Sequence, residues 1–190
     1  KTALSSARSG DVINFRPSST ISTTVDISST TNVTVNLYNT YTSTVNVDLP
    51  NGTVNVYGTI SGKLSVNDAN KVAVQSSAKV TTLDIKSGAK DLAVDNKGTV
   101  TTLDVAATGV SINNSGTITT LNKLSDTKVD GNGTIGNMPV VDTSKPVSEV
   151  KAENGKVVKV KFNKALDYIP SVTITKVGNA NPIDLMPIEL

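Results

Sequence analysis

Three copies of one short pattern decide the fold of this chain: KVTTLDI at Lys79–Ile85, TVTTLDV at Thr99–Val105 and TITTLN at Thr117–Asn122. In each copy the second residue is apolar and a leucine follows three positions later. The apolar positions Val80, Val100 and Ile118 lie 20 and 18 residues apart. A period near 19 residues with apolar residues alternating inside each copy is typical of a solenoid, in which successive coils stack on one another.

The same period extends over most of the chain as three columns of apolar positions. The first column is Ile21, Tyr41, Ile60, Val80, Val100, Ile118 and Ile135. The second column is Val25/Ile27, Val45/Val47, Leu64/Val66, Leu83/Ile85 and Leu103/Val105. The third column is Val33/Val35, Val54/Val56, Val72/Val74, Leu92/Val94 and Val110/Ile112, with Val129 as its last member.

Three columns per period predict about seven coils of 18–20 residues with three short strands in each coil. Each strand then pairs in parallel with its copy in the next coil and points alternate residues inward. The alternative is an antiparallel sandwich with strands every ~8–12 residues. Such a sandwich does not require one period to hold in three columns, so the sequence favours an all-β parallel β-helix.

The composition fits a narrow β structure and argues against several classes of function. Of 190 residues 37% are hydrophobic, with two Phe and no Trp, so we expect a slim aliphatic core. Without any Cys or His, the chain has no disulfides, no thiolate or His-dependent catalysis and none of the usual zinc sites. A net charge of +2 predicts no nucleic-acid partner, and no apolar run approaches the ~20 residues of a membrane span.

The composition changes near residue 142, which predicts a domain boundary. The first Glu is Glu149, and a Pro-containing linker precedes it. We expect a parallel β-helix at 1–142, a linker at 143–147 and a second module at 148–190. In that module Asn154-Gly155 separates two alternating stretches, which is a strong hairpin signal. Because an immunoglobulin-like sandwich needs ~100 residues, we expect the module to be incomplete.

Two stretches resemble known families. ALSSARSGDVINF at Ala3–Phe15 resembles the capping start of pectate-lyase-like right-handed parallel β-helices. VSEVKAENGKVVKVKFNKAL at Val147–Leu166 resembles the opening of the immunoglobulin-like modules of surface-layer (S-layer) and cell-wall proteins from Gram-positive, Bacillus-type bacteria. The resemblance implies a right-handed coil with a short N-terminal capping helix, an immunoglobulin-like second module and an extracellular location at the cell surface or cell wall.

The resemblance and the repeat together predict a structural, non-enzymatic role. We expect a stiff, secreted scaffold that associates with neighbouring copies of itself in a surface layer. No catalytic residue of the resembled families transfers to this chain, and no cofactor is expected. The first alternative is a polysaccharide-binding or lyase-type β-helix, with cell-wall polysaccharide as the partner. The second is an ice-binding solenoid.

The candidate site residues are two outward carboxylates, Asp84 and Asp104, one coil apart. Two carboxylates about 5 Å apart could bind Ca²⁺, or serve as the paired acids of a retaining glycosidase. The outward Asp residues that hold Ca²⁺ in lyases of the resembled fold draw attention to the same pair. The competing interpretation is a solvated polar face on which each Asp meets a lysine or water.

Two further faces are predicted from outward residues. Thr and Ser flank the first column and resemble the T-x-T ice-binding surface of some antifreeze solenoids, although Thr also stacks well on itself in strands. The third column is predicted to expose mostly small residues, as a packing face or a solvated wall: Thr34, Asn55, Ala73, Ala93 and Ser111.

Overall fold

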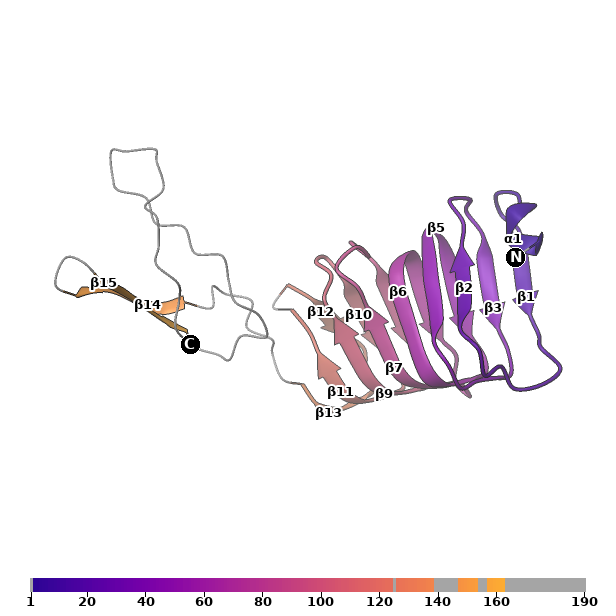
Figure 1. Cartoon of the computed structure of the whole chain (residues 1–190). Helices are drawn as coiled ribbons and strands as arrows, with labels where there is room; N and C mark the ends of the chain where they lie inside the picture. The colour runs from indigo at the N-terminus through magenta and orange to yellow at the C-terminus, as the bar shows by residue number, and fades with distance from the viewer. Residues whose placement is uncertain (1, 125, 139–146, 154–156, 163–190) are drawn as a thin grey trace. The chain divides into compact units, whose positions relative to one another are not determined.

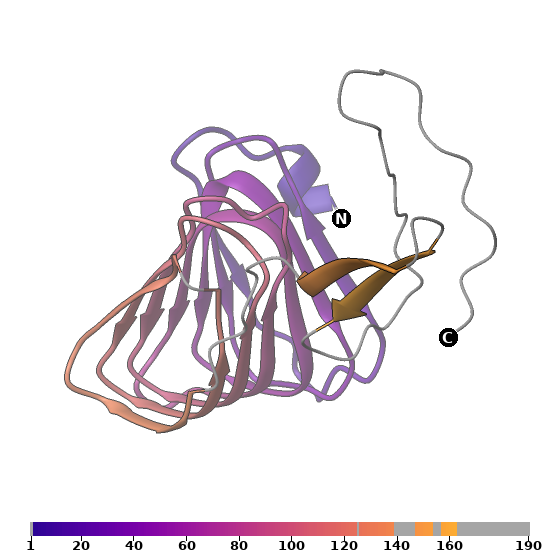
Figure 2. The same cartoon turned by 90° about the vertical axis from the view of Figure 1, so that its left-hand side faces the viewer.

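The computed structural model describes residues 2–124, 126–138, 147–153 and 157–162. Their contacts divide the chain into two compact units, Lys1–Asp142 and Thr143–Leu190. The first unit is a parallel β-solenoid of about seven turns built on one 13-stranded sheet (Figure 1). Figure 2 looks roughly along this solenoid, so that its coils lie one behind another.

The solenoid contains one helical turn and strands β1 to β13. Their bounds are α1 Thr2–Ser5, β1 Val12–Phe15, β2 Val25–Ser28, β3 Thr34–Leu37, β4 Thr40–Tyr41, β5 Val45–Val56, β6 Thr59–Val74, β7 Lys79–Ile85, β8 Ala93–Asn96, β9 Thr99–Val105, β10 Ser111–Asn114, β11 Thr117–Asn122, β12 Lys128–Asp130 and β13 Thr134–Asn137. The second unit contains β14 Val147–Glu153 and β15 Val157–Phe162.

The first two predicted columns are confirmed residue by residue. In the first column Ile60 pairs with Val80, Val80 with Val100, and Val100 with Ile118, all in parallel strands. In the second column Leu64 pairs with Leu83 and Leu83 with Leu103. These partners share inward positions, so every coil rests its apolar side chains on those of the coil before it.

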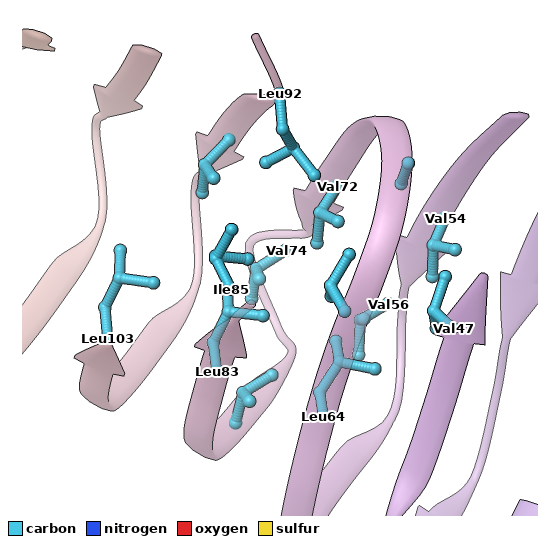
Figure 3. Packing of buried hydrophobic residues seen from close by; sticks show 14 of the residues in the cluster. Val47, Val54, Val56, Leu64, Val72, Val74, Leu83, Ile85, Leu92 and Leu103 are labelled. Atoms are coloured by element: carbon cyan, nitrogen blue, oxygen red, sulfur yellow. The ribbon is translucent and has the colours of Figure 1, made fainter. Parts of the chain in front are cut away.

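The core is a continuous thread of aliphatic side chains inside the coils (Figure 3). Leu64, Leu83 and Leu103 are each 0% exposed, and the valines and isoleucines beside them are equally buried. Each coil contributes only a few such residues, and the core therefore exists only where coils stack.

The register of the third column differs from the prediction. Val35 pairs with Val54, where the repeat predicted Val33, and Val72 pairs with Val94, where it predicted Leu92. A slip of two residues keeps the same side chains inward, because the side-chain period of a strand is two. The pattern of inward residues is therefore compatible with both registers. The outward row that was predicted to run from Thr34 to Ser111 combines residues of two neighbouring rows: Thr34, Ala93 and Ser111 belong to one, and Asn55 and Ala73 to the other.

The corrected register places two asparagines inside the solenoid. Asn96 follows Val74 in the column, Asn114 follows Asn96, and their exposed fractions are 0% and 2%. Asn96 Nδ2 donates to Asn114 Oδ1 at 2.7 Å and to the Thr117 carbonyl at 3.2 Å. Asn114 Nδ2 donates to the Thr134 carbonyl at 3.2 Å. These bonds tie three successive coils together at one corner.

At its N-terminal end the solenoid has only a single helical turn, α1, in place of the short capping helix that the resemblance implied. Leu4 and Ala7 are partly buried and pack against the core. No helix in these described segments is long and apolar enough to cross a membrane.

In the second unit the predicted hairpin is confirmed, since β14 and β15 pair antiparallel. The Asn154-Gly155 turn, the linker residues before Val147 and the rest of the proposed module lie outside the described residues.

Candidate functional site

The candidate carboxylates lie in an outward ladder of the second column, as predicted. Asp84 pairs with Asp104 in parallel register between β7 and β9. The full ladder is Asp26, Asn46, Ser65, Asp84, Asp104 and Asn122.

Asp84 is held by two lysines that sequence reasoning did not assign to it. Its Oδ2 lies 3.2 Å from Lys63 Nζ and 2.7 Å from Lys86 Nζ, while the Asp84 side chain is 12% exposed. Burial raises the pKa of Asp84, but the hydrogen bonds and charges of Lys86 and Lys63 outweigh burial and lower the pKa below its usual 3.8. The carboxylate is therefore ionised at neutral pH.

Asp104 has a different partner. Asn122 Nδ2 donates to Asp104 Oδ1 at 2.6 Å, in the same way that Asn46 donates to Asp26 at 2.8 Å. No group of three or more carboxylates in the part of the chain that the structure describes is arranged to hold a metal ion. A cation at Asp84 and Asp104 would compete with two ammonium groups, so the calcium site stays a prediction.

The calcium prediction is tested by isothermal titration calorimetry with CaCl₂. Binding heat in the wild type that Asp84→Asn abolishes would support it, and no heat in either protein would reject it. Lys63→Met with Lys86→Met is the matched control. If the two carboxylates bind calcium, removing the competing ammonium groups is expected to tighten binding, because the cation no longer displaces an ion pair.

The lysine pair makes the stability of the solenoid depend on Asp84 at acid pH. Because the folded pKa lies below the unfolded one, ionised Asp84 stabilises the fold above about pH 4, and this contribution is lost as pH falls through the folded pKa. We expect Asp84→Asn to unfold earlier in urea than wild type at pH 7, and the difference to shrink towards pH 3. Asp130→Asn, at an exposed position, should change stability little at pH 7.

The threonine face beside the first column is also present. Its longest row, Thr40, Thr59, Lys79, Thr99, Thr117 and Thr134, is in register. Lys79 interrupts this row. The ice-binding alternative stays a prediction that thermal hysteresis of the purified chain would test.

An aromatic and cationic cluster, which the sequence analysis did not identify, lies at the corner after the third column. The rings of Tyr38 and Tyr57 stack with centroids 4.7 Å apart and planes 9° apart. The Arg16 guanidinium carbon lies 3.7 Å from the Tyr38 ring centroid. We call these three residues the Arg–Tyr pile. Tyr41 of the first column lies in the core, and burial raises its pKa to about 12.

The structure also contains a second acidic pair, which the sequence analysis did not identify. Asp48 of β5 and Asp68 of β6 are register partners at the end of the second column, beside a bulge. The four ion pairs found among the described residues involve only two other carboxylates, Asp84 and Asp95, each with two lysines. Asp48 and Asp68 therefore have no ion-pair partner among the described residues.

Scans of protein-family models, of curated proteins and of solved structures each found no match to this chain.

Proposed function

We propose that this chain is a non-catalytic structural segment of a bacterial surface layer or cell-wall-associated assembly, in which it acts as a stiff scaffold that packs laterally against copies of itself. The observation that carries the proposal is the unbroken stack of about seven coils on one 13-stranded sheet. Between the end rungs each strand is hydrogen-bonded to a coil on either side, so bending the rod would break ladder bonds and open the aliphatic core.

Outward side chains reinforce the stack along its length. Asn36 Nδ2 donates to Asn14 Oδ1 at 2.9 Å, and Asn55 Nδ2 donates to Asn36 Oδ1 at 2.8 Å. The Asn46–Asp26 and Asn122–Asp104 bonds join further coils in the same way. Such ladders fix one coil to the next through outward polar side chains, which suits a mechanical element.

The finer features of the proposal rest on the resemblance. They are a right-handed coil, an N-terminal turn that covers the first rung, an immunoglobulin-like module that begins with β14 and β15, and an extracellular location at the cell wall. The paired strands after the solenoid are consistent with such a module, and the packing of Leu4 and Ala7 on the core is consistent with a cover.

Self-assembly of the purified chain tests the proposal. We expect sheets or parallel bundles of rods by negative-stain electron microscopy, and a sedimentation profile that shifts to larger species with concentration. The measurement should span low and high salt, with and without calcium. Dispersed monomers under all of these conditions would contradict the scaffold role.

A further inference from the structure

The Arg–Tyr pile is a pre-ordered surface feature that one strand column builds. Phe15, Leu37 and Val56 are register partners at the ends of β1, β3 and β5, and the residue after each is a member of the pile. The coil spacing therefore places Arg16, Tyr38 and Tyr57 in one row. Because stacking already orders the rings, a partner that docks on them costs little further side-chain entropy.

The chemistry of the pile indicates an acidic protein partner. Tyr and Arg are enriched at the centres of protein interfaces. Arg16 is exposed and forms no ion pair with another described residue, and Tyr57 is 38% exposed. The guanidinium has five N–H donors, and those that do not face the ring can still bind a carboxylate.

The same molecule carries a complementary acidic feature. Asp48 and Asp68 lie directly opposite each other on neighbouring parallel strands. Like charges so placed are destabilising. Neither carboxylate forms an ion pair or a side-chain hydrogen bond within the described segments, in contrast to Asp84 and Asp95, which are each clamped by two lysines. An incoming cation would relieve this repulsion.

Tyr57 of the pile and Asp48 of the acidic pair lie on the same coil, whereas Arg16 lies two coils nearer the N-terminal end of the solenoid. Asp48 lies in the second-column part of β5, and Tyr57 directly follows the third-column end of the same strand. Two solenoids side by side with parallel axes can therefore bring Arg16 of one against the acidic pair of the other after an axial shift of about two coils, ~10 Å. Each copy would use both features on different neighbours.

We propose that the Arg–Tyr pile of one copy docks against Asp48 and Asp68 of a second copy. This inference rests on the proposed scaffold function and names its lateral contact. The contact joins two different surfaces, so it does not close on itself and generates rows of parallel rods. Arg16 supplies the charge contact, while Tyr38 and Tyr57 supply the apolar area.

Complementation between two variants, each of which carries only one of the two intact surfaces, tests the contact. Arg16→Asp reverses the charge of the pile and keeps the acidic pair, whereas Asp48→Lys with Asp68→Lys reverses the charge of the acidic pair and keeps the pile. Each variant alone should lose assembly, with an apparent dissociation constant raised at least ~tenfold. An equimolar mixture should assemble again into rows in sedimentation velocity, because one contact joins an intact pile to an intact acidic pair and the next brings the two reversed charges, again of opposite sign, together.

Matched controls separate this contact from a general effect of charge. Lys90→Asp and Asp130→Lys make the same single-site charge changes elsewhere and should assemble like wild type, and circular dichroism should show every variant folded. Variants that assemble like wild type, or a mixture that stays monomeric, would overturn the contact while leaving the scaffold role intact. A wild type that never assembles would reject both. An Arg16→Asp variant that assembles normally but loses binding to purified cell-wall polysaccharide would assign the pile to a glycan.

Discussion

Replacing Gly116 with alanine is expected to destabilise the solenoid by at least ~3 kcal/mol, near the upper end of the usual cost of overpacking. A Cβ at this position would overlap the Gly98 carbonyl oxygen and lie 2.7 Å from the Lys97 carbonyl carbon, and both atoms belong to the backbone of the adjacent coil. That backbone cannot move away locally, because Gly116 N donates to Asn96 O at 3.0 Å and Thr117 N donates to Gly98 O at 2.9 Å. The coils would have to separate at this corner.

Urea unfolding followed by circular dichroism measures this effect, with Thr119→Ala as the control. Thr119 is exposed on the strand that follows Gly116, so removing its hydroxyl and methyl groups should cost a few tenths of a kcal/mol, in the range of ordinary surface substitutions. A Gly116→Ala protein that unfolds within ~1 kcal/mol of wild type would show that the corner can open, against the close stacking described above.

The three columns differ in how regularly their residues are spaced along the chain, and this difference explains how much of the fold could be predicted. The first two columns follow directly from spacings that stay near 19 residues, and their register was correct. The third column follows connections of unequal length, since Val66 lies six residues before Val72 whereas Ile85 lies nine residues before Val94. Counting along the chain therefore could not fix its register, and alternation alone accepts any slip of two residues.

The same reasoning applies to the surface features. The adjacency of Asp84 and Asp104 was predictable because both occupy one place in the repeat. The partners of Asp84 were not predictable, because Lys63 reaches it from the previous coil and Lys86 from just beyond the end of β7. The Arg–Tyr pile was detectable in principle, since each member directly follows the last inward residue of a third-column strand, but only with the correct register.

The continuous core leads to the second large effect, at Leu83. This side chain is 0% exposed and lies between Leu64 of the preceding coil and Leu103 of the next. Leu83→Ala should cost ~2–5 kcal/mol, because the removed atoms leave a cavity that two ladders of backbone hydrogen bonds keep from collapsing.

Leu4→Ala, a leucine-to-alanine substitution at the end of the solenoid, is the control for Leu83→Ala in its middle. Leu4 of α1 is only partly buried and packs against the core. Leu4→Ala is therefore expected to cost less than half as much as Leu83→Ala in the same urea titration, because solvent and the short N-terminal segment can fill the space. Equal losses at the two positions would mean that stability does not depend on stacking between coils. A Leu83→Ala loss below ~1 kcal/mol would mean that the aliphatic thread is not a packed core, and a rod without that core could not be stiff.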